Sequence, residues 1–433
     1  MSLDRRLFLQ QTLAGAVAGA LLPDVGAAAT LPPAAGAPGP GDAEELAAQW
    51  DIDRSVTNLE NAYWGVMLRA VEQAFLDETR LLNRRNVLFV RNGIPGREYD
   101  AALERVRTDL AQLMQAPASE FAFARNGTEA LQCLITQYAR LRPGDAVLYA
   151  DLDYDEMQQA MESLRDRRSV TVRKFAIPEP ATTANILAAY ERELREAPAS
   201  LKLLLVTHLS NRTGVVMPVR EIVAMARARG VDTIVDAAQT IGHVDFTLAD
   251  LDADFVGFSL HKWLAAPIGT GAIWIRAARL ADIEPCMGST MYAADDTRSR
   301  TSIGTVNPAA TLTVPAALAF HRAIGGRRKQ AHLQSLREQW VHGVRDLPGM
   351  QILTPEEPAR YGAVTSFRLP AMRDHREAQR MAALLLGKHR ILTVARRGIA
   401  GGSAVRVTPA LYNTRAEVDR LVEALRTEAA GFR

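Results

Sequence analysis

The feature that most constrains the fold is a run of short apolar segments that alternate with helical patterns between about residues 121 and 276. Four of these segments lie at 121–123, 146–149, 203–206 and 233–235. Short apolar runs separated by helices are typical of parallel strands that are buried on both faces of a sheet. The sequence therefore predicts an α/β fold with a doubly wound, mostly parallel sheet.

A second pattern begins after about residue 311. A long helical stretch runs through residue 347, alternating segments follow at 362–369 and 404–407, and a helix closes the chain from residue 414. This order of elements predicts a smaller α+β domain over 311–433, packed against a large domain over 44–310. With 433 residues, the chain is long enough to bury a full hydrophobic core.

The amino terminus has the features of a cleavable export signal. Two adjacent arginines, Arg5 and Arg6, precede a short apolar stretch that ends in small residues near Ala29. This stretch is too short to span a bilayer comfortably, and the arginine pair is typical of twin-arginine signals. The alternative is a cytoplasmic helix that happens to contain two arginines.

The signal interpretation has two consequences for the chain. Residues 1–29 would be removed, and the folded protein would reach the periplasm through the twin-arginine export machinery. Residues 30–43 are rich in Pro, Gly and Ala, and we expect them to form a linker.

Composition excludes several classes of function. The chain has 51 Lys and Arg against 49 Asp and Glu, without a long run of one sign, so we expect no nucleic-acid surface. Its two cysteines, Cys133 and Cys286, have no zinc-binding spacing, so we expect no metal site either. Whether the two cysteines form a disulfide bond stays open. Function must then depend on a local site.

Polar residues cluster where the predicted strands end, which is where ligands bind in doubly wound sheets. These clusters lie at 126–128, 153–154, 208–211, 236–239 and 259–262. Asp236 and Lys262 both follow apolar strands, so we expect them to face the same crevice. A desolvated lysine that can bond an aldehyde, with a carboxylate that keeps a pyridine nitrogen protonated, is what a pyridoxal phosphate enzyme needs.

The phosphate of such a cofactor needs backbone N–H groups at a helix start and small hydroxyl groups. Gly127 and Thr128 lie at the start of a predicted helix, and Ser259 and His261 are placed to complete the phosphate site. Tyr154 lies at a strand end, where its ring can cover the cofactor. Each feature alone also has a structural explanation, such as a helix cap. Their common sheet edge favours a cofactor site.

Three motifs carry a family resemblance: VDAAQ at 235–239, DFVGFSLHKW at 254–263 and GTG at 269–271. They resemble the class V aminotransferase family of fold-type I pyridoxal phosphate enzymes, and within it the isopenicillin N epimerase-like branch. The resemblance extends from about residue 62 to the C-terminus. It implies that Lys262 forms the Schiff base with the cofactor and that Gln239 binds the ring hydroxyl. Asp236 would be the partner of the pyridine nitrogen.

The resemblance also bears on the phosphate and on assembly. It implies that Gly127, Thr128, Ser259 and His261 hold the phosphate. Thr305 matches a segment that reaches the phosphate of the neighbouring subunit in the family. This match implies a homodimer with shared active sites.

Two further segments resemble family segments near the substrate. Arg406 matches an arginine that binds the α-carboxylate, and a guanidinium suits that role because it forms two parallel hydrogen bonds to a carboxylate. His208 and Asn211 match a segment that passes over the cofactor. For a lone histidine at a strand end, a structural hydrogen-bonding role is an equal alternative.

The loop before Arg406 departs from the pattern of cysteine desulfurases. Those enzymes need a nucleophilic cysteine there, but residues 396–405 contain none, so desulfurase activity is not expected. The pair Arg396 and Arg397 could meet an acidic substrate group or could be ordinary solvated loop charges.

Together with the predicted export signal, the resemblance implies an exported enzyme that acts on the amino group of an amino acid, or of an amino-acid moiety in a peptide or secreted metabolite. Transamination and epimerisation are the expected reactions. The alternatives left open are a periplasmic siderophore-tailoring enzyme, a C–S lyase and a non-catalytic binding protein of the same fold.

Overall fold

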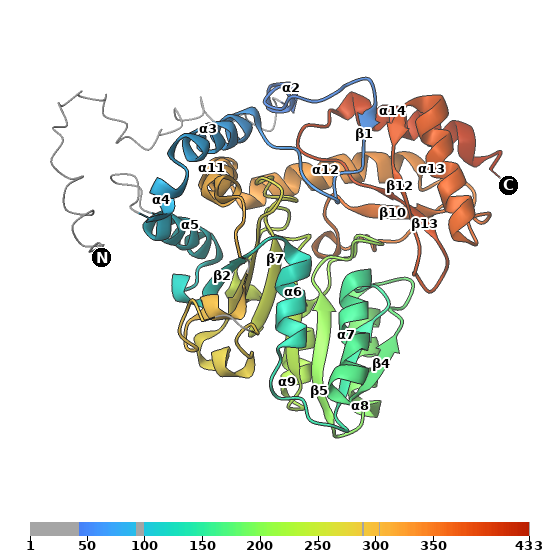
Figure 1. Ribbon diagram of the computed structural model, residues 1–433. Helices are drawn as coiled ribbons and strands as arrows, with labels where there is room; N and C mark the ends of the chain where they lie inside the picture. Colours follow the sequence, from blue (N-terminus) through green and yellow to red (C-terminus); the bar gives the residue numbers. More distant parts are fainter. Residues whose placement is uncertain (1–42, 92–98, 288–289, 303, 433) are drawn as a thin grey trace, which may run out of the picture. The chain divides into compact units, whose positions relative to one another are not determined.

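The computed structural model describes residues 43–91, 99–287, 290–302 and 304–432 (Figure 1). The predicted signal at 1–29, and the linker at 30–43 apart from its last residue, lie outside these residues. The described part of the chain belongs to one compact unit.

The predicted doubly wound sheet is present and has seven strands in the order β2-β8-β7-β6-β5-β3-β4. Strand β8 runs antiparallel to both of its neighbours, and all the other pairs are parallel. The strands are β2 (Phe121–Ala124), β3 (Ala146–Ala150), β4 (Thr171–Phe175), β5 (Leu201–Thr207), β6 (Asp232–Asp236), β7 (Phe255–Ser259) and β8 (Gly271–Ile275). The α/β prediction is therefore confirmed.

Alternate residues of the central strands enter two different apolar clusters, one on each face of the sheet. In β5, Leu203 and Leu205 join the cluster of α6 (Gly127–Thr136) and α7 (Asp155–Arg168). Leu204 and Val206 join the cluster on the opposite face, which includes residues of α5, α8, α9 and α11. Each such fully buried side chain contributes about 1.5–3 kcal/mol relative to an exposed one. Figure 1 shows α6 and α7 lying over the strands.

The helices of the second face complete this layer of the structure. They are α5 (Tyr99–Met114), α8 (Thr183–Glu196), α9 (Val219–Arg227) and α11 (Pro308–Ile324). The shorter or more peripheral elements are α2 (Ala43–Ala47), α3 (Arg69–Arg85), α4 (Val87–Arg91), α10 (Leu248–Leu251), and the 3₁₀ turns η1 (Ala118–Glu120), η2 (Ala277–Asp282), η3 (Thr297–Arg300) and η4 (Pro358–Arg360).

The long helical stretch predicted after residue 311 is two helices rather than one. α11 ends at Ile324, and α12 (Gly326–Val344) begins immediately after Gly325. Gly325 has a φ of 84°, in the left-handed region that favours glycine, so the helix breaks there.

The C-terminal part contains an antiparallel sheet in the order β12-β13-β10-β9. Its strands are β9 (Gln351–Ile352), β10 (Thr365–Arg368), β12 (Val394–Arg396) and β13 (Ala404–Val407), with helices α13 (His375–His389) and α14 (Arg415–Ala429) packed against it (Figure 1). The segment β1 (Thr57–Asn58) pairs in parallel with β11 (Ile391–Leu392), and Leu59 is buried in the same apolar cluster. An early segment thus joins the C-terminal part, and the division into domains at residue 310 stays a prediction.

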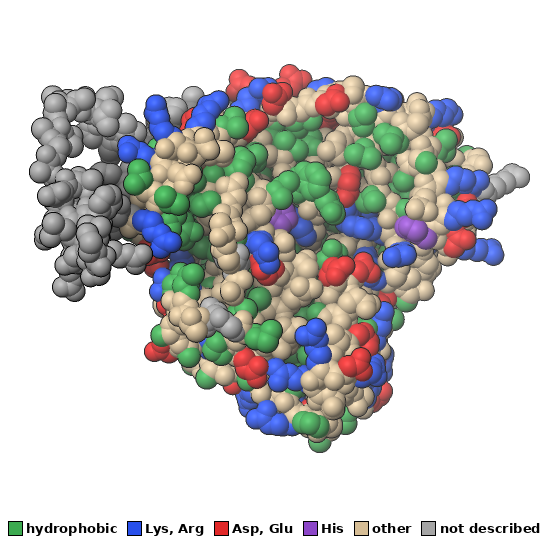
Figure 2. Space-filling model, viewed as in Figure 1, with side chains coloured by type: hydrophobic (Ala, Val, Ile, Leu, Met, Phe, Trp, Pro, Cys, Tyr) green, Lys and Arg blue, Asp and Glu red, His purple; other side chains and the backbone are tan. Residues whose placement is uncertain are grey.

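Three findings concern the described residues as a whole. None of their helices is both long and apolar enough to cross a bilayer. They contain no group of three or more His, Cys, Asp or Glu side chains arranged to hold a metal. Cys133 and Cys286 are both free thiols. On the face shown in Figure 2, basic and acidic side chains are interspersed.

Candidate active site

Several predicted site residues lie along the carboxyl edge of the seven-stranded sheet, whereas Arg406 belongs to β13 of the C-terminal sheet and Thr305 to the loop before α11. Asp236 is the last residue of β6 and Ser259 the last of β7, and the register places Asp236 beside both Thr207 of β5 and Gly257 of β7. The strands end at the same edge because they are parallel. The register therefore brings Asp236 and Ser259 to one edge of the sheet, and their roles at a cofactor stay a prediction.

The start of α6 forms a cup of hydrogen-bond donors at this edge. The Asn126 side chain caps the helix by accepting from the Glu129 N–H at 2.8 Å, and the Ser259 Oγ accepts from the Gly127 N–H at 3.1 Å. Of the helix's first N–H groups, the hydrogen bonds among described residues leave that of Thr128 for a ligand. A helix start with a free N–H and nearby hydroxyls fits a phosphate group.

Close packing at the cup requires glycine at residue 127. A Cβ there would lie 2.5 Å from Ser259 Oγ and 3.1 Å from the Ala238 Cβ. The α6 backbone can approach β7 this closely only without a side chain. Gly127 therefore serves the cup in two ways: its backbone N–H is a donor, and its lack of a side chain allows α6 to pack closely against β7.

His261 adds a titratable group beside the cup. Its Nδ1 lies 3.0 Å from the Thr270 carbonyl oxygen, so Nδ1 is the donor in this hydrogen bond. Burial lowers the pKa of the His261 ring, and the neutral form then leaves Nε2 without a proton. A bound phosphate would favour protonation of Nε2, which could then donate to it.

Lys262 and Asp236 lie in surroundings that shift the pKa of both side chains. Burial lowers the pKa of the Lys262 amine to about 8, and the Asp236 carboxylate opposes this shift. Asp236 is buried, its Oδ1 accepts from the Ala238 N–H at 2.9 Å, and burial raises its pKa. The Lys262 Nζ lies 6.0 Å from the centre of the Tyr154 ring, so the ring and the amine face each other.

Gln239 is buried within the site, whereas Thr305 is exposed. The Gln239 Nε2 donates to the Ala62 carbonyl at 2.9 Å, and its Oε1 accepts from Trp263 Nε1 at 2.8 Å. One amide N–H of Gln239 therefore remains for a ligand, and its predicted role at the ring hydroxyl stays a prediction. Thr305 lies exposed in the loop before α11, and its role at a neighbouring subunit stays a prediction.

Arg406 is fully buried, and its guanidinium already has partners in the chain. Its Nη1 donates to the Asn211 carbonyl at 2.7 Å, and its Nη2 donates to both carboxylate oxygens of Glu60, with 2.7 Å to Oε2. Sequence reasoning missed Glu60. Its segment, β1 and the residues after it, is too short to show a period, and its partner lies 346 residues away.

The two residues predicted beside Arg406 differ in what surrounds them. The His208 ring packs edge-on against Phe246 with 4.9 Å between centres, and burial lowers its pKa to about 3. Its backbone N–H donates to the Asp236 carbonyl at 2.9 Å, but its ring Nδ1 is buried without a hydrogen-bond partner among the described residues, so a structural hydrogen-bonding role of the ring is not seen. The Asn211 Oδ1 is buried and has no hydrogen-bond partner among the described residues, so it can accept from a ligand.

A second buried carboxyl group stands beside Asp236 and was not among the predicted site residues. The Asp153 carboxylate accepts from the Thr207 N–H at 2.9 Å and from the Ala150 N–H at 2.7 Å. Burial raises the pKa of Asp153 to about 7. Its position in the 153–154 cluster was the available signal. The two backbone bonds indicate that it fixes the ends of β3 and β5.

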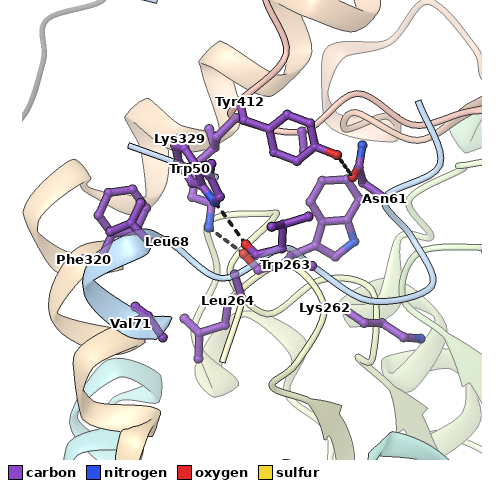
Figure 3. A pocket seen from close by; sticks show the side chains of 15 residues that line it. Trp50, Asn61, Leu68, Val71, Lys262, Trp263, Leu264, Phe320, Lys329 and Tyr412 are labelled. Carbon is purple, nitrogen blue, oxygen red and sulfur yellow. Dashed lines mark hydrogen bonds between the residues drawn. The ribbon is translucent and has the colours of Figure 1, made fainter. Parts of the chain in front are cut away.

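A small apolar cavity lies behind Lys262 (Figure 3). Its volume is about 40 Å³, and its lining includes Trp50, Phe320 and Tyr412. The Lys329 Nζ donates to the Trp263 carbonyl at 2.6 Å in its wall. The Lys262 side chain points away from this cavity in Figure 3. The residues that line the cavity therefore pack against the backbone of the lysine loop and not against the Lys262 amine.

Residues 90–421, more than half of the chain, match the family model described as Aminotransferase class-V. Isopenicillin N epimerase from Streptomyces clavuligerus is 29% identical over 402 residues, which cover 89% of this chain and 98% of that protein. Probable cysteine desulfurase 2 of Mycobacterium leprae (strain TN) is 29% identical over 347 residues, covering 75% of this chain and 80% of that protein.

A solved structure has the same fold. The apo structure of cysteine desulfurase from Thermococcus onnurineus NA1 matches with a TM-score of 0.77 at 22% identity, and the match covers 90% of this chain and 98% of that one. The fold of the described residues is thus found in a complete solved chain of similar length.

Proposed function

Because this chain belongs to the aminotransferase class-V family and is a pyridoxal phosphate-dependent enzyme, we propose that it acts on the amino group of an amino acid or of an amino-acid moiety in a peptide or secreted metabolite. The observation that carries the proposal is the Lys262 amine. Burial lowers its pKa to about 8, the charge of the buried Asp236 opposes this shift, and the amine lies 6.0 Å from the centre of the Tyr154 ring.

The described residues fit the cofactor. The cup of Gly127, Thr128 and Ser259 suits its phosphate, since its donors point from a helix start and a Cβ at residue 127 would fill it. The Asp236 carboxylate would hold a proton on the pyridine nitrogen, and Tyr154 would cover the ring. When bound, pyridoxal phosphate supplies an electron sink that stabilises negative charge at the carbon beside the substrate amine.

Lys262 would do the proton transfer. A lysine with a pKa near 8 gives up and takes back a proton at neutral to mildly alkaline pH, where one with a pKa of 10.5 stays charged. Its amine would remove the proton from the substrate carbon and could return it to that carbon or leave it to be added elsewhere. Epimerisation would need a second group that protonates this carbon from the opposite face, and transamination would need the proton to be delivered away from this carbon.

Epimerisation is favoured by one comparison. The isopenicillin N epimerase of Streptomyces clavuligerus covers 89% of this chain at 29% identity, and its name denotes a change of configuration.

We also propose that the enzyme works in the periplasm. The support is the sequence: Arg5 and Arg6 stand ahead of a short apolar stretch. Replacing both by lysine should keep the protein in the cytoplasmic fraction, whereas the parent should appear in the periplasmic fraction in a shortened form. Equal distribution of the two proteins would contradict export by this route.

The cofactor assignment is tested on the chain from residue 30. The parent should be yellow with pyridoxal phosphate, and borohydride should fix the cofactor on the peptide that contains Lys262, as mass spectrometry would show. Lys262→Ala should bind the cofactor without this label. Lys388→Ala is a matched control, because Lys388 is an exposed helix residue. A parent that is never labelled at Lys262 would exclude the proposed chemistry.

A further inference from the structure

Trp263, the residue that follows Lys262, is held from three sides. Its indole Nε1 donates to Gln239 Oε1 at 2.8 Å, and its backbone carbonyl accepts from Lys329 Nζ at 2.6 Å (Figure 3). Its ring stacks on the His243 ring with 3.8 Å between centres. Only 6% of Trp263 is exposed. Its position is therefore set by contacts with other elements as well as by the lysine loop itself.

Lys329 holds the backbone side of Trp263. It lies near the start of α12, is 3% exposed, and forms no ion pair with another described residue. Burial lowers its pKa to about 7 because the charged amine is kept away from water. The rest of α12 is fixed, since Leu333 is buried in the cluster of the large sheet and Leu336 in that of the C-terminal sheet. Lys329 therefore holds the Trp263 carbonyl from a rigid helix.

His243 holds the ring side of Trp263. Its Nε2 accepts from the Ala363 N–H at 2.7 Å, and its Nδ1 lies 3.0 Å from the Gln239 carbonyl oxygen, so Nδ1 carries the proton and donates. Burial lowers the pKa of His243 to about 3, so the ring is neutral at neutral pH. A neutral ring with both nitrogens bonded is a fixed surface on which the Trp263 indole stacks.

The bond between Trp263 and Gln239 fixes the part of the Gln239 amide that is left for a ligand. An indole N–H only donates, and a backbone carbonyl only accepts. Trp263 therefore bonds Oε1, and the Ala62 carbonyl accepts one N–H of Nε2 at 2.9 Å. One bond would leave the amide free to turn about it, whereas two bonds at opposite ends fix its plane. The second N–H of Nε2 then has a fixed direction before any ligand binds.

We propose that Trp263 is a positioning residue for the cofactor, because its indole fixes the Gln239 amide so that an N–H meets the ring hydroxyl of pyridoxal phosphate. Asp236 lies three residues before Gln239, and Lys262 directly precedes Trp263. One hydrogen bond thus joins the two segments that carry the reactive groups. This inference rests on the proposed function, since it concerns how the same site binds its cofactor.

The test compares pyridoxal phosphate with its 3-deoxy analogue, which lacks the ring hydroxyl. Calorimetric titration of the apoenzyme gives a dissociation constant for each, and the ratio of analogue to cofactor measures the preference for the hydroxyl. W263F should lower this ratio by about 10-fold, because a hydrogen bond to an ionised ring oxygen contributes about that factor. W274F is the matched control, since Trp274 is also buried but donates to Glu120, and its ratio should equal the parent's.

A merely structural role of Trp263 would weaken the binding of both compounds equally. An unchanged ratio in W263F would therefore overturn the proposal. If W263F does not melt cooperatively, W263M replaces it, because methionine also lacks an N–H donor and fills irregular space.

A double-mutant cycle tests whether Trp263 acts through Gln239. Q239L should lower the ratio at least as much as W263F does, and W263F/Q239L should lower it no further than Q239L alone. Additive losses would contradict the proposal. Borohydride labelling of Lys262 separates this inference from the proposed function: an unlabelled parent contradicts the proposed function, whereas a labelled W263F with the parent's ratio contradicts only the role of Trp263.

Discussion

The two ends of the site differ in the charge of the groups that form them. The cup at the start of α6 consists of neutral groups, namely backbone N–H donors and the Ser259 hydroxyl, that belong to neighbouring elements of one sheet. The β12–β13 end consists of full charges, and the Glu60–Arg406 pair joins segments 346 residues apart. Neutral donors bind a ligand only when close packing positions them correctly, whereas a buried charge is stable only beside a charge of the opposite sign. Substitutions should therefore affect the first end through sterics and the second through electrostatics.

The largest effect should come from the group that lies between the two ends. We expect Lys262→Ala to slow exchange of the substrate Cα proton with deuterium oxide by at least about 1,000-fold, because a positioned proton-transfer group contributes 10²–10⁴-fold. Proton NMR of the holoenzyme with an accepted amino acid measures this rate. An exchange rate within tenfold of the parent would show that another residue moves the proton.

At the charged end, removal of one partner should cost stability. Glu60→Ala leaves the Arg406 charge buried without compensation, and we expect a loss of about 3 kcal/mol in the free energy of unfolding. Urea denaturation measures it. Asp346→Ala breaks the exposed Asp346–Arg426 pair and should cost far less stability, because solvent screens exposed charges. Equal losses in both variants would remove the distinction between the two ends.

At the neutral end, added volume should matter more than lost charge. The Cβ of Gly127→Ala would lie 2.5 Å from Ser259 Oγ, so we expect cofactor affinity to fall by about 10-fold. Fluorescence titration of the apoenzyme with pyridoxal phosphate measures it. Gly387→Ala, in the open surface of α13, has no atom within 4 Å of the new Cβ and should leave affinity unchanged while raising stability by about 0.5–1 kcal/mol.

The smallest effect should be electrostatic coupling between the ends. Cofactor attachment needs the neutral Lys262 amine, so its rate should rise with pH and level off above a midpoint near 8. In R396Q, loss of a nearby positive charge should move that midpoint to higher pH, because the ammonium form is no longer opposed. Stopped-flow absorbance after mixing apoenzyme with cofactor gives both midpoints. A shift to lower pH would contradict the coupling.

The same pKa has a consequence for stability in the absence of cofactor. The pKa of Lys262 is lower in the folded protein, at about 8, than its ordinary value of 10.5. The unfolded state thus binds more protons between these two values, and this residue's contribution to stability rises as the pH increases through that window. Below pH 8 Lys262 is charged in both the folded and the unfolded state, so its effect on the free energy of unfolding no longer changes with pH.

The neutral end could be predicted from the sequence because its signals are local. The apolar runs defined the strands, and the polar residues directly after Val235 and Phe258 defined their ends, so Asp236, Ser259 and Lys262 followed. The same logic failed at Gly325, where one glycine within a helical pattern divides α11 from α12. Periodicity alone does not show which glycine takes a positive φ.

The charged end could not be predicted because its pairing is not local. Arg406 was found from a resemblance to family motifs, but no pattern near Glu60 indicates that it reaches β13. β1 has two residues, too few for an alternation to appear. The position of Arg396 beside Arg406 depends on the register of β12 and β13, which the sequence leaves undetermined.

The pairing of β1 with β11 also constrains the order of events during synthesis. Next to it, the Asn61 Nδ2 donates to the Thr408 carbonyl across 347 residues of chain. At 5–20 residues per second, a ribosome needs on the order of 20 to 70 s to make the second segment after the first. Residues 57–61, including Glu60, therefore have no partner strand until translation is nearly complete. The Glu60–Arg406 pair is thus the last part of the site that can form during synthesis.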